Sequence, residues 1–258
     1  MKHGMWDREM VALLLLLAMM PLLLAWLGFG GVEAIVRLVL TLVISGLWHM
    51  IFMLARAQPP SFAGAVTAVA VAMLAPQDLS MVQLILGVSF GSVMAELVFG
   101  GWGRNVLNPA TVTLAFLGFG FPAAPWHDFA TPVSWAAIAS LAVGTVFGVM
   151  SARLILGAVA VLVLGFVAGG PLVDVAPMAG IVLALLVADP VASASTRFGA
   201  WMNGALYGAL VVLFASGWQG AAAAQIAVSA ALLASLAAPL LDEVAIALWR
   251  ARRRKRHG

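Results

Sequence analysis

The stretch Met10-Val-Ala-Leu-Leu-Leu-Leu-Leu-Ala-Met-Met-Pro-Leu-Leu-Leu-Ala-Trp-Leu-Gly28 contains no charged residue. The hydrocarbon core of a bilayer is about 30 Å thick, and a straight helix of about 20 apolar residues crosses it. The run therefore predicts a transmembrane helix. A second apolar run follows Phe29-Gly-Gly31 without the small-residue cleavage site of a secretory signal, so we expect the first helix to be retained.

The rest of the chain has the same apolar character. Of its 258 residues, 64% are hydrophobic and 9% are charged, whereas about 25% of the residues in soluble domains are charged. We expect an all-α integral membrane protein that forms a single membrane domain over residues 1–258. The absence of cysteine excludes disulfides, thiolate-bound iron–sulfur clusters and c-type haem attachment on this chain.

Apolar segments bounded by glycine, proline and charged residues predict about ten helices. Their ranges are 10–28, 33–55, 62–75, 80–98, 109–121, 132–150, 153–168, 173–188, 199–216 and 220–241. The shortest of them are 62–75, 109–121, 153–168 and 173–188. Short helices in membrane proteins are often tilted or broken and line a site, and we expect this of these segments.

Lysine and arginine residues predict the orientation, because the positive-inside rule keeps those near helix ends in the cytoplasm. With ten spans both termini lie on one side of the membrane, and twelve of the 13 Lys and Arg residues fall on that side, Arg37 being the exception. We therefore expect both termini to be cytoplasmic. The basic tail, residues 249–258, is interpreted as a stop signal that meets anionic lipid, with docking of a partner protein as the alternative.

A weak internal repeat is also visible. Ala72-Met-Leu-Ala-Pro76 resembles Leu186-Val-Ala-Asp-Pro190, and Gly101-Trp102 resembles Gly217-Trp218, at offsets of 114 and 116 residues. We expect repeats over about 8–122 and about 130–242. Each would hold five helices, and an odd number of spans gives the two units opposite orientations, with the functional site between them.

The motif Phe99-Gly-Gly-Trp-Gly-Arg-Asn-Val-Leu-Asn-Pro-Ala110 follows the fourth predicted helix. Its glycines lack the Cβ atoms that would keep a flat ligand away. Asn108 can cap the next helix, with Pro109 at the first position. Close helix packing with an ordinary cap is the alternative explanation. The candidate ligand-binding residues of this motif are Gly100, Gly101, Gly103, Arg104, Asn105 and Asn108.

A second motif, Ala188-Asp-Pro-Val-Ala-Ser-Ala-Ser-Thr-Arg-Phe-Gly199, lies at the same predicted face in the second half. An acid at the end of a membrane helix is usually functional, and the hydroxyls could cap the next helix or bind a polar ring edge. A solvated loop with a capping serine is the alternative. The candidate ligand-binding residues here are Asp189, Ser193, Ser195 and Thr196.

Two further ionisable residues lie inside predicted helices, Glu96 in the fourth and His49 in the second. Either could face a cavity and relay protons or ions. For His49, a packing role with its hydrogen bonds satisfied is an equal alternative. Glu96 lies one turn before the glycine motif, which favours a functional role.

The two motifs, in this order and at this spacing, resemble those of the NqrB/RnfD family, the membrane flavin subunits of sodium-pumping NADH:quinone oxidoreductases and Rnf complexes. The resemblance covers roughly residues 8–245. The matching residues are Gly100, Gly101, Gly103, Asn105, Asn108, Pro109 and Ala110 in the first motif and Asp189, Pro190, Val191 and Gly199 in the second, followed by Gly204-Ala-Leu.

The resemblance implies a ten-helix protein of the bacterial inner membrane that holds riboflavin non-covalently, and also FMN esterified to a threonine ten residues before the aspartate of the second motif. That position is Ala179 here, and no threonine lies between Thr145 and Thr196. We therefore expect non-covalent flavin, riboflavin or FMN, and no covalent FMN.

The leading hypothesis from the sequence is an electron-transfer subunit that is not catalytic alone and forms part of a translocase-type oxidoreductase complex. Its flavin would exchange electrons between a ferredoxin-like or FMN-carrying membrane subunit and quinone or another acceptor, with or without ion movement. We expect contacts with membrane lipid and none with nucleic acid. The alternatives are a solute or ion transporter of inverted-repeat fold and a scaffold subunit without a cofactor.

Overall fold

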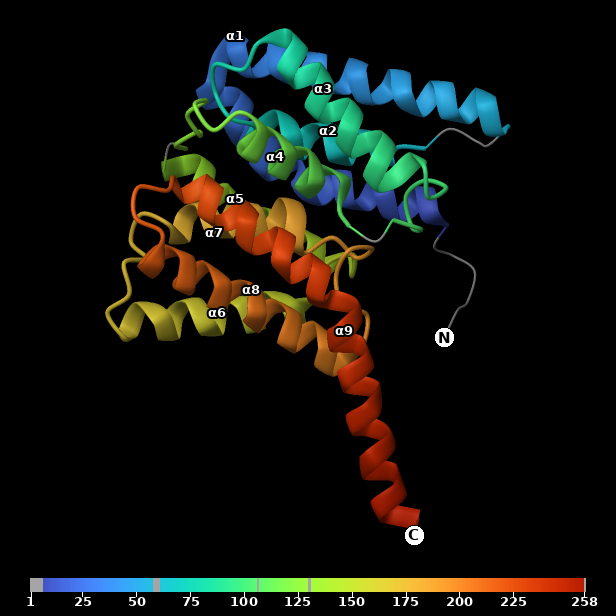
Figure 1. Ribbon diagram of the computed structural model, residues 1–258, viewed down its shortest axis with the longest axis vertical. Coiled ribbons are helices and arrows are strands. Elements are labelled where there is room, and N and C mark those ends of the chain that lie inside the picture. Colours follow the sequence, from blue (N-terminus) through green and yellow to red (C-terminus); the bar gives the residue numbers. More distant parts are fainter. Residues whose placement is uncertain (1–6, 58–60, 106, 130, 258) are drawn as a thin grey trace.

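The computed structural model describes residues 7–57, 61–105, 107–129 and 131–257, and its regular structure in these ranges is entirely helical. Figure 1 shows most of these helices running side by side across the molecule. In chain order they are α1 (Arg8–Arg56), α2 (Ala63–Leu74), α3 (Met81–Gly91), η1 (Ser92–Leu97), α4 (Pro109–Gly120), α5 (Thr131–Val146), α6 (Ala152–Val167), α7 (Ala176–Val182), η2 (Leu183–Val187), α8 (Arg197–Gly217) and α9 (Ala223–His257).

Helix α1 consists of two helices that are joined at a sharp break. Gly31 lies at the break with φ 60° and ψ −146°, a conformation that glycine adopts far more readily than other residues. The chain reverses its direction there, so that the two halves of α1 run back past each other (Figure 1). These halves correspond to the predicted helices 10–28 and 33–55.

The remaining predicted helices are all present in the described part of the chain, with two differences in length. Six of the helices, and not only the four expected, are shorter than 18 residues, because α3 with η1 and also α5 end early. Helix α9 runs 16 residues beyond the predicted end at 241, through the basic tail. Within the described ranges α1, α8 and α9 are long and apolar enough to cross a membrane; the count of ten spans stays a prediction.

The two short helices α3 and α7 each end in a π-helical segment, η1 and η2. A π-turn contains one more residue per turn than an α-helix, which rotates the side chains that follow, and such turns are frequent at functional sites. Segment η1 carries Glu96 into the interior of the protein, where 1% of the residue is exposed.

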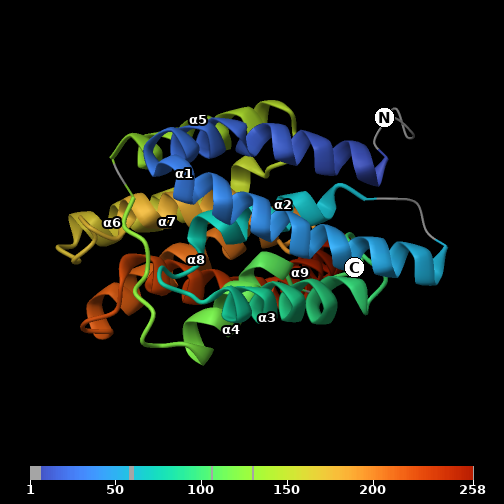
Figure 2. The same ribbon diagram turned by 90° about the horizontal axis from the view of Figure 1, so that it is seen from above.

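Helices pack in equivalent pairs in the two halves of the chain. In the first half α4 contacts α2 and α3, and in the second half α9 contacts α7 and α8. The two halves meet where α1 contacts α5 and where α4 contacts α9; Figure 2 shows α1 beside α5. This pattern agrees with the expected repeat, although the repeat itself stays a prediction.

Helices α6 and α8 approach each other closely through glycines. A Cβ atom on Gly204 of α8 would collide with the backbone carbonyl of Leu154 in α6. Small residues at such crossings let membrane helices pack backbone against backbone. The match of Gly204 to the family motif therefore has a packing explanation.

Candidate functional site

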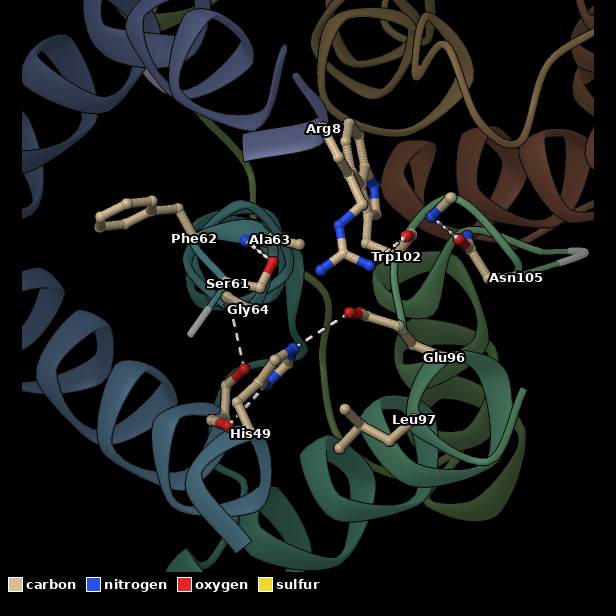
Figure 3. A network of polar contacts seen from close by, with 12 residues as sticks. Arg8, His49, Ser61, Phe62, Ala63, Gly64, Glu96, Leu97, Trp102 and Asn105 are labelled. Carbon is tan, nitrogen blue, oxygen red and sulfur yellow. Dashed lines mark hydrogen bonds and ion pairs between the residues drawn. The ribbon is translucent and has the colours of Figure 1, made fainter. Parts of the chain in front are cut away.

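A cavity of about 320 Å³ opens between the two ends of α1, the residue Ser61 shortly before α2, and η1 with the loop that follows it. Its volume falls at the lower end of the range for small-molecule sites, roughly 300–1,000 Å³. Figure 3 shows the polar contacts of Arg8, His49 and Glu96, which belong to its lining. The cavity is lined by Arg8, Gly46, His49, Met50, Phe52, Met53, Arg56, Ser61, Glu96, Leu97, Gly101 and Trp102.

His49 and Glu96 form a pair at this cavity, 3.0 Å between Nε2 and Oε1 (Figure 3). The Nδ1 atom of His49 lies 2.9 Å from the carbonyl oxygen of Ser45. A carbonyl only accepts hydrogen bonds, so Nδ1 carries a hydrogen, and one proton must lie between Nε2 and Glu96. Whether that proton is on the imidazole or on the carboxyl, the pair is neutral and contains a transferable proton.

The second carboxyl oxygen of Glu96, Oε2, is buried and has no hydrogen-bond partner among the described residues. The hydroxyl of Ser92, one turn earlier in η1, is in the same situation. Leaving a buried polar group unpaired costs about 1–3 kcal/mol, so such groups are rare and usually have a function. Within the described part of the chain Glu96 thus has free hydrogen-bonding capacity beside the cavity.

Two arginines border the same cavity. Arg56 donates from Nη1 to the carbonyl of Leu97 at 2.6 Å and from Nη2 to that of Val98 at 3.3 Å. Arg8 donates from Nη1 to the carbonyl of Trp102 at 3.5 Å and pairs with Glu9 through Nε at 3.1 Å. A guanidinium has further N–H donors beyond these. The arginines can therefore also bind an anionic group at the cavity.

The glycine motif forms the loop beside this cavity. Gly100, Gly101 and Gly103 have φ values of 108°, 91° and 91°, which side-chain-bearing residues rarely adopt. Asn105 holds the loop, accepting from the backbone N–H of Gly103 at 3.0 Å and donating to the carbonyl of Leu107 at 2.9 Å. The positive φ values thus favour glycine at these positions. Arg104, in the same loop, is exposed.

The two sequence motifs meet through a direct hydrogen bond between side chains. Asn108 donates from Nδ2 to Oδ2 of Asp189 at 2.7 Å, and both residues are buried. The Oδ1 atom of Asn108 caps α4 by accepting from Ala110 and Thr111, and Oδ1 of Asp189 accepts from the N–H of Val191. The predicted cap is confirmed, and no ring lies between Asn108 and Asp189 because they bond to each other.

The hydroxyls of the second motif bind Asp242 of α9. Ser195 donates to Oδ2 from its N–H at 2.8 Å and its hydroxyl at 2.9 Å. Thr196 donates to Oδ1 from its N–H at 2.9 Å and its hydroxyl at 2.6 Å, and its hydroxyl also caps α8 by accepting from Gly199. Ser193 lies in the same loop, partly buried. This loop is therefore fixed by Asp242.

Ala179, which occupies the position of the expected threonine, is fully buried in α7, and its carbonyl accepts from the hydroxyl of Tyr207 at 2.9 Å. Its neighbours Met178 and Gly180 line a second cavity of about 610 Å³ between α5 and α7. Asp128 and Asp174 border this cavity, and its lining contains no lysine or arginine among the described residues.

The structure divides the predicted site residues into separate groups. Glu96, His49 and Gly101 share the first cavity. Asn108 and Asp189 join the two halves, and Ser195 with Thr196 anchors α9. Sequence reasoning missed Arg8, Arg56 and Asp242 as partners. The two arginines had a signal, because each flanks an apolar run, but it was interpreted only as a mark of orientation.

The helices and the His49–Glu96 pair define an all-α membrane protein with a cavity that is lined mainly by apolar side chains and holds an ionisable pair. The chain belongs to the NQR2, RnfD, RnfE family, whose model matches residues 3–176. It is 36% identical over 100 residues to a subunit of the Na(+)-translocating NADH-quinone reductase of Klebsiella pneumoniae, and the match covers 39% of this chain and 24% of the relative.

Two further relatives are the same subunit of this reductase in other bacteria. The protein of Pseudomonas aeruginosa is 41% identical over 83 residues, 32% of this chain and 21% of the relative. That of Neisseria meningitidis is 37% identical over 95 residues, 37% of this chain and 23% of the relative. The matched stretch thus spans about a quarter of the length of these curated relatives.

Proposed function

We propose that this chain is a membrane electron-transfer subunit that binds a flavin non-covalently in the cavity between the two ends of α1 and η1. One observation carries the proposal. The buried carboxyl of Glu96, paired with the half-buried His49 and with one oxygen that no described residue pairs, lies at a cavity that Phe52 and Trp102 line and two arginines border. The names of the relatives describe subunits of an NADH-quinone reductase, which supports a redox role within a complex of several subunits.

The lining fits the chemistry of a flavin. Its isoalloxazine ring is flat and apolar on both faces, and Phe52, Trp102 and Met50 provide apolar contacts of the kind that such rings prefer. The polar ring edge carries N–H and carbonyl groups, which Glu96 and His49 can bind. The donors of Arg8 and Arg56 favour the phosphate of FMN over uncharged riboflavin.

The second cavity fits this ligand less well. Asp128 and Asp174 would repel a phosphate, and its described lining offers no cation to neutralise one. Riboflavin could enter it without this penalty. A second, uncharged ring near Ala179 is therefore compatible with the proposal, and the FMN-type ligand is assigned to the first cavity.

A bound flavin supplies electron storage, and its reduction takes up protons. The protein would position the flavin and supply a proton for its reduction. The His49–Glu96 pair holds one proton next to the ring position, and the carbonyl of Ser45 keeps His49 in the orientation that points Nε2 at Glu96. Arg8 and Arg56 lie at the opening, where their charge favours an anionic ligand.

We place this subunit in a bacterial inner membrane with both termini cytoplasmic, next to ferredoxin-like or FMN-carrying redox subunits and with quinone or another acceptor as the electron sink. The direct Asn108–Asp189 hydrogen bond supports this proposal over a solute transporter. A solute path between the two halves would need space between the two motifs, and this bond holds them in contact. A scaffold without cofactor is the other alternative, and the following experiment separates the two.

The test is the flavin content of the purified protein. We expect a visible absorbance band that acid releases completely, with FMN as the main product on chromatography. Gly46 lines the cavity and a Cβ there meets open space, so Gly46→Leu should fill the cavity without a clash and lower the FMN content at least tenfold. Gly28→Leu, which also adds its side chain to open space but away from the cavity, is the control and should retain FMN.

A colourless wild-type protein prepared together with its neighbouring subunits would contradict the proposal and favour the scaffold. Equal FMN contents in the two glycine variants would contradict the assignment to this cavity.

A further inference from the structure

Helix α9 is too long to serve only as a membrane span. It runs from Ala223 to His257, which is 35 residues and about 52 Å at 1.5 Å per residue, whereas the hydrocarbon core is about 30 Å thick. Pro239 lies inside it, and a proline inside a helix removes a hydrogen bond and bends the helix. Beyond this region α9 leaves the bundle and runs across the direction of α6 and α8 (Figure 1).

The two views agree on this direction. In Figure 1 the end of α9 points away from the body, and in Figure 2, turned by 90°, it is seen nearly end-on among helices that run across the picture. If the bundle helices cross the membrane, the end of α9 therefore lies roughly parallel to the membrane plane. It emerges at the end of the bundle that also carries the Ser195–Thr196 loop.

The segment after Pro239 is amphipathic. Leu240, Val244 and Leu248 are spaced by four residues, which places them on one stripe of the helix, and they are exposed to 65%, 37% and 43%. Glu243 and Arg250 lie on another face. Among the described residues nothing covers these three apolar side chains, and a row of exposed apolar side chains indicates contact with an apolar environment such as lipid.

The same segment ends in a concentrated positive charge. From Arg250 to Arg256 every residue except Ala251 is Lys or Arg. At the start of this run Arg253 lies over the ring of Trp249 at 5.2 Å, and Trp249 is 59% exposed. Tryptophan beside basic residues is typical of the boundary between the headgroups and the acyl chains.

Asp242 fixes the beginning of this segment. Its four hydrogen bonds from Ser195 and Thr196 connect the first turn after Pro239 to the loop before α8. The helix therefore leaves the bundle from a fixed point at one end of the bundle.

We propose that residues 240–257 form an in-plane interfacial helix that binds anionic phospholipid. Leu240, Val244 and Leu248 enter the acyl layer, while Arg250, Arg252 and Arg253 bind headgroup phosphates. Charge complementarity selects the lipid, because the cytoplasmic leaflet carries anionic headgroups and a helix with one apolar stripe and a basic end is the form that binds them. The proposal is independent of the flavin.

The absence of cysteine gives a direct test of helix placement. The full-length protein carrying Leu248→Cys or Glu243→Cys is spin-labelled and reconstituted in vesicles of phosphatidylcholine and phosphatidylglycerol. We expect the label at 248 to collide with oxygen dissolved in the bilayer and the label at 243 to collide with a nickel chelate in water. Water exposure at both positions would overturn the proposal and indicate that the helix extends into the cytoplasm, available to an acidic protein.

Lipid selectivity is tested on the same chain. A fluorophore on Leu248→Cys is quenched by brominated phosphatidylglycerol or brominated phosphatidylcholine in mixed vesicles. We expect the wild-type chain to be quenched more strongly by the phosphatidylglycerol. In the combined variant Arg250→Gln, Arg252→Gln, Arg253→Gln this preference should fall by roughly fivefold for each of the charges removed. The matched variant with Lys at these positions should keep the preference. Equal quenching by the two lipids in the wild-type chain would overturn the proposal.

Discussion

The cavity at Glu96 and the loop at Thr196 contain similar residue types but use them in opposite ways. In the loop, both oxygens of Asp242 accept hydrogen bonds, and the hydroxyls of Ser195 and Thr196 are their donors. At the cavity, one oxygen of Glu96 is buried without a partner among the described residues, and the arginines retain N–H donors. The polar groups of the loop are hydrogen-bonded to each other. At the cavity, Glu96 Oε2 has no hydrogen-bond partner in the part of the chain that the structure describes.

The difference shows which polar residues of a membrane protein mark a ligand. Both motifs contain acids, amides and hydroxyls near helix ends, and in the sequence they are equally good candidates. The hydrogen bonds of Asp242 to Ser195 and Thr196 account for this carboxylate by its structural role, so it needs no ligand. A carboxyl group such as that of Glu96, with one oxygen that no described residue satisfies, costs free energy in folding, and a ligand can offset that cost.

The largest loss of stability is expected where the two halves join. Asn108→Ala removes the cap of α4, worth about 1 kcal/mol, and leaves buried Asp189 with one hydrogen bond fewer, worth about 2 kcal/mol more. Unfolding in detergent with increasing sodium dodecyl sulfate should show a loss of about 3 kcal/mol. Gln83→Ala, which removes part of an exposed capping box, is the control and should cost about 1 kcal/mol or less.

The largest effect on rate is expected at the cavity. Glu96→Gln keeps the size of the side chain and a hydrogen bond to His49, but the amide cannot transfer a proton. The rate of flavin reduction should fall about 100-fold, as is typical when a positioned proton donor is lost, while the FMN content and the unfolding free energy stay near the wild-type values. Stopped-flow absorbance measures the rate; a wild-type rate would exclude the pair as the proton source.

A smaller loss of stability is expected in the loop. Asp242→Ala removes four hydrogen bonds and leaves two backbone N–H groups to find water, which should cost about 2 kcal/mol because the site is partly exposed. The flavin content per folded molecule should not change. Glu243→Ala, its exposed neighbour, is the matched control. A loss of flavin in the Asp242 variant alone would mean that the loop belongs to the ligand site after all.

The smallest effect is expected at the rim of the cavity. Arg8→Gln should weaken the retention of FMN about threefold to tenfold, which corresponds to about 0.7–1.4 kcal/mol, and should leave the retention of added riboflavin unchanged. Arg8→Lys, which keeps the charge, should recover part of the loss. Equilibrium dialysis of deflavinated protein against each flavin measures both constants. Equal losses for the two flavins would show that Arg8 does not bind the phosphate.

Much of the fold could be predicted from the sequence because apolar runs and their breaks are local signals. Gly30-Gly31 marks the reversal inside α1, and Asn108-Pro109 marks the start of α4. The end of α9 could not be predicted in this way. The apolar run predicts a helix that ends at 241, before the basic tail, but arginine is a good helix former and the helix continues through the tail to His257.

The site was only partly predictable because its contacts join distant residues. Glu96 and His49 were both singled out, but nothing in the sequence shows that they bond to each other across 47 residues. The same holds for Asn108 with Asp189 and for Thr196 with Asp242. The π-helical turn of η1, which directs Glu96 inward, has no sequence signal that we recognise.

The most direct test of the central claim is a cryo-electron microscopy map of the chain purified with its neighbouring subunits. We predict a flat density between Trp102 and the His49–Glu96 pair, within hydrogen-bonding distance of Glu96 Oε2 and with its charged end at Arg8 and Arg56. A cavity without such density, together with a flavin bound elsewhere in this chain, would contradict the account.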